Sequence, residues 1–129
     1  MMAERSQGAA LSPSEQATMR DLLGADRERT MARVASLTRD WDAIVESSAL
    51  VATDDEHDPE GSSTAFERAH VQALLDQAQS HLADLDTAME RLDDGTYGVC
   101  ERCGRPVAVE RLKVRPAAKT CITCASARR

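Results

Sequence analysis

Residues 95–124 read GTYGVCERCGRPVAVERLKVRPAAKTCITC, and this stretch holds all four cysteines of the chain. A two-residue spacer turns both sulfurs of a C-x-x-C pair toward one point, and 17 residues separate the two pairs here, which is within the range of four-thiolate zinc sites. Four thiolates also fill a tetrahedral coordination sphere. The stretch therefore predicts one structural Zn²⁺ whose ligands are Cys100, Cys103, Cys121 and Cys124.

Two other uses of paired cysteines fit the chain less well. A redox C-x-x-C requires a thioredoxin-like βαβ context, which the sequence lacks, and disulfides are rare in the cytoplasm, where we expect this protein. The module has about 35 residues and few apolar side chains, so we expect the metal to supply much of its stability. Those few apolar side chains are Val107, Val109, Leu112, Val114 and Ile122.

Upstream of the cysteines, apolar residues recur in steps of four and three, which predicts a long helix with a heptad seam. Thr64 and Glu67 form a candidate capping box at its start, and Gly95 is the expected stop. The seam consists of Val71, Leu75, Ala78, Leu82, Leu85, Met89 and Leu92.

A second row with similar spacing predicts a partner helix. Ser12, Pro13 and Glu15 are typical of a helix start, and Gly24 is expected to bend or end that first helix. Because the chain has no third long helix to complete a bundle, the two rows favour an antiparallel coiled-coil hairpin. The second row consists of Arg27, Thr30, Val34, Leu37, Trp41, Ile44 and Ser48.

Between the rows, residues 53–62 contain helix-breaking Pro59 and Gly61 together with five carboxylates. Two interpretations stay open for this acidic tip: a solvated turn, or an acidic probe that meets a cation or a basic partner. The acids considered for partner binding are Asp54, Asp55, Asp58 and Glu60.

Composition agrees with thin helical packing rather than a thick core. The chain has 129 residues, one Trp, one Tyr and one Phe, and no apolar run long enough to span a membrane. Its net charge of −6 hides an uneven distribution, since residues 100–129 carry 8 basic and 2 acidic groups. Such a basic end suits nucleic acid or an acidic protein surface. No catalytic Ser/His/Asp or Cys/His set and no phosphate loop is present, so an enzyme is not expected.

The motifs around the cysteines resemble the DksA/TraR C4-type zinc-finger proteins of bacteria. The resemblance rests on residues 95–104, on the pairs Arg111-Leu112 and Arg115-Pro116, and on residues 121–124. An Asp-Pro turn in the preceding hairpin extends it over roughly residues 27–129. The resemblance implies a cytoplasmic transcription regulator that binds RNA polymerase directly, without sequence-specific DNA binding.

In that family the coiled coil enters the secondary channel of the polymerase, and acids at its tip approach the active centre. Asp58 matches the first acid of the family's D-x-x-D-x-A motif, whereas Gly61 and Ser63 replace the second Asp and the Ala. Some members bind guanosine tetraphosphate through basic residues late in the second helix. This chain has no Lys or Arg between Arg68 and Arg91, so we do not expect that nucleotide to bind through this helix.

Taken together, the sequence predicts a mostly α fold: a long antiparallel coiled-coil hairpin, a small four-cysteine zinc-finger module and a short C-terminal helix. The predicted segments are an N-terminal tail and short helix at 1–25, the hairpin at 26–94 and the zinc-finger module at 95–129. The predicted function is transcription regulation through RNA polymerase. The alternative is a zinc ribbon that binds nucleic acid or acts as a protein adaptor.

Overall fold

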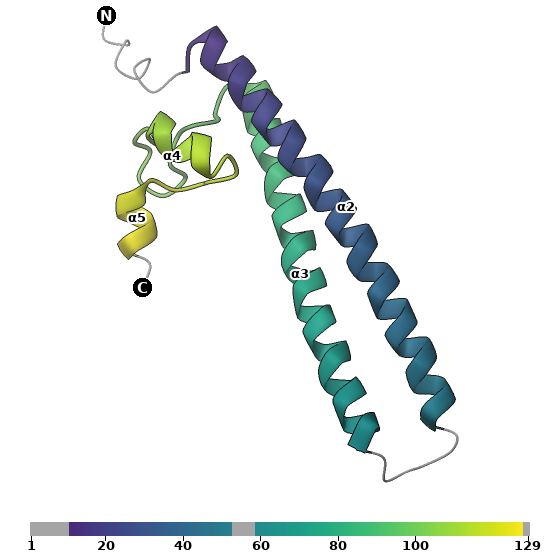
Figure 1. Ribbon diagram of the computed structural model, residues 1–129. Coiled ribbons are helices and arrows are strands. Elements are labelled where there is room, and N and C mark those ends of the chain that lie inside the picture. Colours follow the sequence, from purple (N-terminus) through teal and green to yellow (C-terminus); the bar gives the residue numbers. More distant parts are fainter. Residues whose placement is uncertain (1–10, 53–58, 128–129) are drawn as a thin grey trace, which may run out of the picture. The chain divides into compact units, whose positions relative to one another are not determined.

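The computed structural model describes residues 11–52 and 59–127, and these residues form four helices (Figure 1). Helix α2 comprises Pro13–Ala52 and helix α3 Pro59–Asp94, and the short helices α4 (Val109–Val114) and α5 (Ile122–Ala127) follow. The described residues contain one isolated β-bridge and no strand. None of the described helices is long and apolar enough to cross a membrane. The predicted mostly α fold with a helical hairpin and clustered cysteines is confirmed.

Helix α2 begins with the predicted capping box. The Glu15 backbone N–H donates to Ser12 Oγ at 3.0 Å, and the Ser12 N–H donates to Glu15 Oε1 at 2.9 Å. The expected break at Gly24 is absent, because α2 continues through it to Ala52. A glycine in a helix costs only about 1 kcal/mol relative to alanine. Burial of the neighbouring Leu23 offsets that cost.

Helix α3 begins at Pro59, five residues before the expected start at Thr64. Proline is tolerated there because the first helical residue needs no N–H donor. The predicted stop is confirmed: α3 ends at Asp94, and Gly95 has a φ of +85°. Seven positions of the α3 seam are buried or half-buried, and the described positions of the α2 row are likewise shielded.

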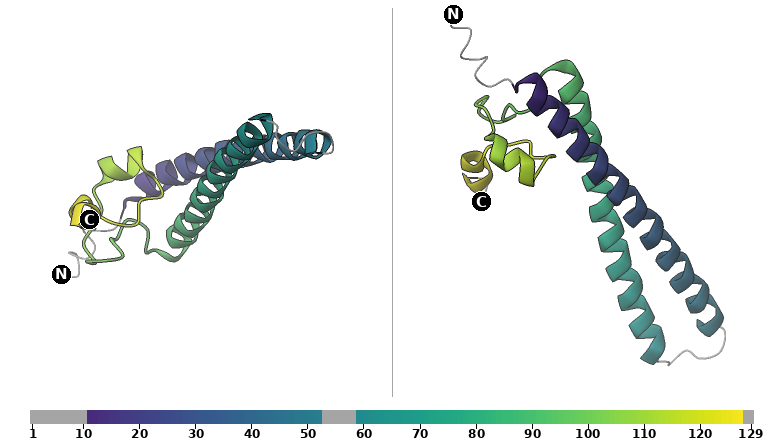
Figure 2. Two further views of the ribbon diagram at one scale, coloured as in Figure 1. Left: turned by 90° about the horizontal axis from the view of Figure 1, so that it is seen from below. Right: turned by 45° about the horizontal axis from the view of Figure 1, so that its top comes forward.

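The chain divides into two compact units, which we call the cysteine unit (residues 1–28 and 83–129) and the arm unit (residues 29–82). In the arm unit, α2 and α3 run in opposite directions, as Figures 1 and 2 show. Its buried seam residues include Leu37 and Ala78. The 24 arm residues that α2 contributes extend over about 36 Å at 1.5 Å per residue. The boundaries predicted at residues 25 and 94 stay predictions.

Two ion pairs in the cysteine unit show which residues of α2 and α3 lie opposite each other. Arg20 Nη1 lies 3.0 Å from Asp93 Oδ1, and Arg27 Nε lies 2.6 Å from Asp86 Oδ1. The two pairs are seven residues apart on each helix, in opposite directions, as heptad packing of antiparallel helices requires. Such exposed pairs contribute little stability, so the register depends mainly on the apolar seam.

The hydrophobic core of the cysteine unit joins residues that are far apart in the sequence. Helices α2 and α3 both contribute to it, and so does the segment that carries the cysteines. Because Cys100 itself belongs to this core, the cysteine segment and the helices bury their apolar side chains together. The buried members are Leu11, Met19, Leu23, Leu85, Ala88, Leu92, Tyr97, Cys100, Val107 and Leu112.

Tyr97 connects three parts of the cysteine unit. Its hydroxyl donates to the Pro116 carbonyl at 2.7 Å and lies 3.5 Å from the sulfur of Met19. Desolvation raises the pKa of Tyr97 to about 12, and the charge of Arg91 opposes this only in part. The phenol is therefore held neutral, as a donor to Pro116, well above its usual pKa of 10.

We expect the free energy of unfolding to fall as the pH rises from 10, the usual pKa of tyrosine, to about 12, the pKa of Tyr97 in the folded chain. Above pH 10 the unfolded chain releases the Tyr97 proton while the folded chain retains it, so unfolding is favoured until the pH passes about 12. Because Tyr97 is the one tyrosine, ultraviolet titration of tyrosinate reports it alone. We expect a midpoint near 12 in the folded protein, and a midpoint near 10 would contradict this environment.

The Tyr97→Phe variant should lose about 1–2 kcal/mol of unfolding free energy in urea, because the Pro116 carbonyl loses its donor.

Candidate metal centre

The first cysteine pair lies in a tight turn shaped by backbone hydrogen bonds. The Gly104 N–H donates to the Cys100 carbonyl at 2.9 Å, and the Cys100 N–H donates to the Arg105 carbonyl at 2.7 Å. Gly104 has a φ of +75°, a conformation that side-chain-bearing residues rarely adopt. Two N–H groups also point at sulfur: that of Cys103 lies 3.5 Å from Cys100 Sγ, and that of Arg105 lies 3.4 Å from Cys103 Sγ.

The second pair opens helix α5 and repeats this pattern. The Ala125 N–H donates to the Cys121 carbonyl at 2.9 Å, and the Cys124 N–H lies 3.5 Å from Cys121 Sγ. A hydrogen bond from the Glu101 N–H to the Lys119 carbonyl, 2.9 Å long, ties the two turns together. Each turn thus directs its sulfurs toward the other turn.

The four sulfurs lie close enough to share one ion. All lie within 4.8 Å of one another, and Cys103 Sγ is 3.8 Å from Cys121 Sγ. A tetrahedral ion with Zn–S bonds of about 2.3 Å requires S···S separations of about 3.8 Å. The predicted C4 zinc site with one zinc ion therefore fits the arrangement of the four cysteines.

The pKa values of the thiols differ strongly within the cluster. Desolvation raises the pKa of Cys100, but hydrogen bonds from the backbone N–H groups of Cys103, Cys121 and Arg102 outweigh it and lower the pKa to about 6. The N–H of Cys124 lowers the pKa of Cys121. Desolvation and hydrogen bonds with the other sulfurs raise the pKa of Cys124 to about 12. A bound cation would favour the ionised form of its cysteine ligands, because a metal ion binds the thiolate rather than the thiol.

Other parts of the chain hold the cluster in place. Arg111 Nε donates to the Thr120 carbonyl at 3.1 Å, directly before the second pair. Arg91 Nη2 donates to the Val99 carbonyl at 2.6 Å, directly before the first pair. Long side chains from α4 and α3 therefore fix the chain on the N-terminal side of each cysteine pair.

Two groups of predicted residues have different outcomes. The structure brings together the four cysteines that the sequence analysis singled out. Asp54, Asp55 and Asp58 lie outside the described residues, and so does the side chain of Glu60, whose backbone lies in the first turn of α3.

The five apolar side chains that the sequence offers to the module differ in burial. Val107 and Leu112 are buried and Val109 is half-buried, but Val114 and Ile122 are exposed. A six-residue helix can turn only one side toward a core, and Leu112 occupies that side of α4. Apolar composition alone did not indicate which of the five residues point outward.

Comparison with known proteins places this arrangement in context. Residues 95–129 match the family model described as the prokaryotic DksA/TraR C4-type zinc finger, which confirms the resemblance noted in the sequence. An uncharacterized protein of Aquifex aeolicus is 43% identical over 44 residues, or 34% of this chain and 30% of the relative. The RNA polymerase-binding transcription factor DksA of Caulobacter vibrioides is 35% identical over 57 residues, or 44% of this chain and 40% of the relative. The matched sequence thus spans well under half of these curated relatives.

The similarity in structure extends further along the chain than the similarity in sequence. The structure of transcription factor DksA2 from Pseudomonas aeruginosa matches with a TM-score of 0.74 and 26% sequence identity. The match covers 91% of this chain and 84% of the DksA2 chain. The helices that precede the cysteines are therefore part of the shared fold.

Proposed function

Since residues 95–129 of this chain match the family model of the DksA/TraR C4-type zinc finger, we propose that the protein regulates transcription by binding RNA polymerase directly. The observation that carries this proposal is the likeness of the fold to that of DksA2 over 91% of the chain, together with this chain's own four-cysteine cluster. A cytoplasmic location follows from such a partner. The proposal requires no catalytic step and no sequence-specific contact with DNA.

We propose that the zinc ion is structural and that all four cysteines are its ligands. Four thiolates leave no open coordination position at which a substrate or a water molecule could be activated. Because Cys100 belongs to the core that α2 and α3 share with the cysteine segment, the ion holds that segment against the two helices. This chain's own contribution is to present a partner-binding surface of defined shape.

We further propose that the arms carry the acidic tip into the secondary channel of the polymerase. Support comes from the antiparallel helices of the arm unit and from the five carboxylates in residues 53–62. Asp58 stands where the related proteins have the first tip acid. With Gly61 in place of the second acid, we assign the contact with the active centre to Asp58 and its neighbours Asp54, Asp55 and Glu60.

Guanosine tetraphosphate is not expected to bind through the second helix. That stretch has no Lys or Arg between Arg68 and Arg91, and Asp84 of α3 already pairs with Lys119 at 3.1 Å. A polyphosphate at this position would meet the Asp84 carboxylate and would have to displace it from Lys119. We therefore propose that regulation by this protein does not depend on that nucleotide at this helix.

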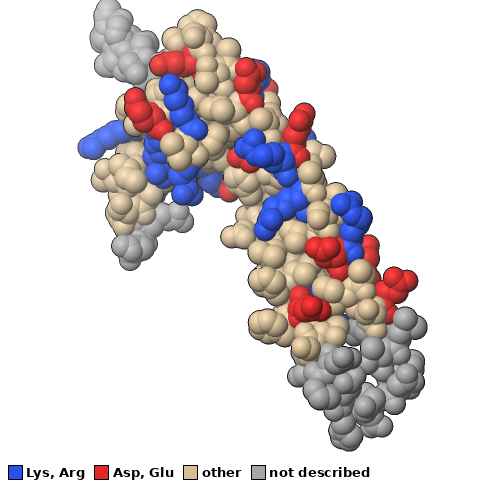
Figure 3. All heavy atoms as spheres, viewed as in Figure 1, with Lys and Arg blue, Asp and Glu red and all other residues tan. Residues whose placement is uncertain are grey.

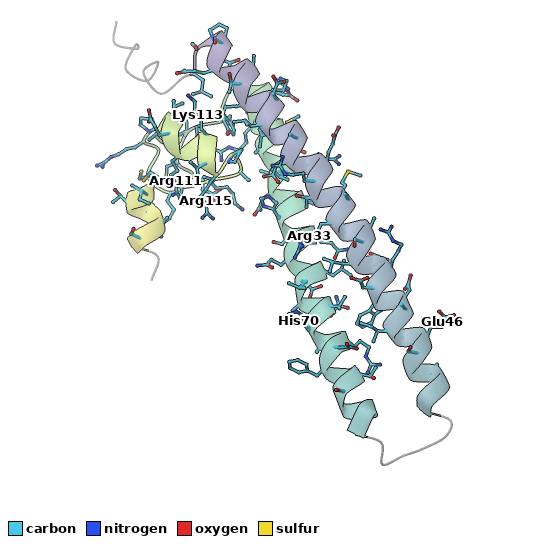
Figure 4. The ribbon with its side chains drawn as sticks, viewed as in Figure 1. Arg33, Glu46, His70, Arg111, Lys113 and Arg115 are labelled. Atoms are coloured by element: carbon cyan, nitrogen blue, oxygen red, sulfur yellow. The ribbon has the colours of Figure 1, made fainter. Side chains whose placement is uncertain are left out.

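Transcription in vitro with purified polymerase tests the role of the tip. We expect Asp58→Ala to weaken the effect on transcription about tenfold, which corresponds to 1.4 kcal/mol of lost interaction. Gly61→Asp, which restores the second acid, should strengthen the effect. Glu46→Ala is the matched control, because Glu46 is an exposed acid of α2 outside the tip (Figure 4).

The same proteins separate the possible failures. If Asp58→Ala and Gly61→Asp both change transcription as much as the wild type does, the tip has no part in the mechanism. Co-purification of the protein with core polymerase would still support RNA polymerase as its direct partner. A wild-type protein that neither co-purifies with polymerase nor changes its transcription would contradict the proposed function. Steeply salt-dependent binding of DNA by such a protein would instead favour a nucleic-acid-binding zinc ribbon.

A further inference from the structure

The cysteine unit has an open cavity of about 550 Å³. Its walls come from helix α4, from the start of helix α5 and from the chain after the first cysteine pair. A volume of this size accommodates one or two large side chains of another molecule. The residues that line it include Arg105, Glu110, Arg111, Val114, Arg115 and Ile122.

Two apolar side chains at this cavity are unusually exposed. Val114 is 80% exposed and Ile122 is 62% exposed, although the module has few apolar residues that could fill its own core. Single exposed apolar residues are common, but a pair of exposed β-branched residues lining one cavity gives that cavity an apolar part. The cavity therefore favours an occupant with a bulky apolar side chain.

The rim of the cavity is basic. It has three arginines and one acid, Glu110, and Lys and Arg gather over this part of the molecule on the face drawn in Figure 3. Arg111 uses its Nε to hold the Thr120 carbonyl. Within the described ranges 11–52 and 59–127, the side chains of Arg105 and Arg115 have no ion-pair partner. Their charges are thus available to an acidic occupant.

The basic side chains of α4 and of Arg115, which directly follows it, point in different directions. Figure 4 shows Arg111 and Arg115 together on one side of the helix and Lys113 on the other. Arg111 and Lys113 are two residues apart in α4, a spacing that places two helical side chains on opposite faces. Lys113 does not line the cavity, so it supplies a basic control residue only two positions from Arg115.

We propose that the cavity between α4 and α5 is a docking site for an acidic segment of a partner protein. One branched or aromatic side chain of that segment packs between Val114 and Ile122, and carboxylates beside it face Arg105 and Arg115. A nucleic acid fits this surface less well. The apolar part of the cavity offers nothing to a phosphate, and the module's one aromatic residue, Tyr97, is buried and so cannot stack on a base. The site uses no residue of the tip and can be tested without RNA polymerase.

The test measures binding of fluorescent peptides to the zinc-loaded full chain by fluorescence anisotropy. The probe is a short peptide with one leucine among aspartates and glutamates. One control peptide has serine in place of leucine, and another has lysines in place of the acids. We expect the first peptide to bind at least about tenfold more tightly than either control, because it alone offers both the apolar anchor and the carboxylates.

Protein variants locate the site. We expect Arg115→Glu and Val114→Ser each to weaken binding of the probe about tenfold, and Lys113→Glu to change it less than about twofold. Phe66→Ser is the apolar control, since Phe66 is 75% exposed but belongs to the arm unit. Zinc content and far-ultraviolet circular dichroism verify that each variant is folded. The changed side chains are exposed, so we expect no loss of fold.

Three results would overturn the proposal. Equal weakening by Arg115→Glu and Lys113→Glu would indicate general attraction between charges rather than a site. Unchanged affinity with Val114→Ser would remove the apolar anchor. Tighter binding of a single-stranded oligonucleotide than of the acidic peptide, with the same dependence on Arg115, would assign the surface to nucleic acid.

Discussion

Cys100→Ser is expected to abolish zinc binding and to unfold the cysteine unit. Cys100 is 1% exposed and belongs to the core that also contains Met19, Leu23 and Leu112, so the change removes a candidate ligand and buries an unpaired hydroxyl at once. Zinc binding in small zinc fingers contributes about 10–16 kcal/mol. We expect the free energy of unfolding of the unit to fall by at least about 5 kcal/mol, which is the entire stability of many small domains.

Zinc analysis and thermal melts check this expectation. The one tyrosine, Tyr97, lies in the cysteine unit, and the one tryptophan, Trp41, lies in the arm unit, so the two signals follow the two units separately. A strong chelator added to the wild type should reproduce the loss of the Tyr97 signal. Thr123→Ala is the matched control, because Thr123 is exposed and lies between two candidate ligands without offering a sulfur. A Cys100→Ser protein with one bound zinc ion and an unchanged melt would refute the expectation.

Leu23→Ala should cause the second-largest loss of stability. Leu23 is fully buried among side chains of α2, α3 and the cysteine segment, and truncating a buried leucine to alanine costs about 2–5 kcal/mol. The cavity left behind would not collapse easily, because its walls come from three separate parts of the chain. We expect a loss of about 3 kcal/mol in urea unfolding followed by far-ultraviolet circular dichroism.

Leu22→Ala is a control at the adjacent position. Leu22 is only half-buried, so the same chemical change should cost about 1 kcal/mol. Both variants alter the helix propensity of α2 by the same amount, which leaves burial as the difference between them. Equal losses for the two variants would mean that the core of the cysteine unit does not extend to Leu23.

Local patterns in the sequence were sufficient to predict the helices and the grouping of the cysteines. The heptad row from Val71 to Leu92 predicted the buried face of α3, and the reciprocal hydrogen bonds of Ser12 and Glu15 match the capping box read from the sequence. The two C-x-x-C pairs predicted the cluster because each pair creates its own turn. Each of these features is built from short patterns, in which neighbouring members stand at most four positions apart.

Features that depend on distant residues were not predictable in this way. Nothing in the sequence near Gly24 shows that Leu23 packs in a core with Leu85 and Leu112, which keeps α2 continuous there. Val114 and Val107 are the same type of residue, but packing leaves Val114 exposed and Val107 buried. The sequence predicts a start at Thr64 rather than at Pro59 because proline and glycine usually break helices, although a first helical turn tolerates both.

The core around Cys100 also limits how residues 95–129 can be transferred to another protein. Residues 95–129 match the zinc-finger family model, yet half of the buried core of the cysteine unit comes from before residue 90. A chimera that grafts only residues 95–129 onto a foreign scaffold would leave Leu112 and Val107 without their neighbours from α2 and α3. A graft that is to stay folded must include the α2 and α3 segments of the cysteine unit. The smallest set of residues that can be transferred therefore consists of two separate stretches of the sequence.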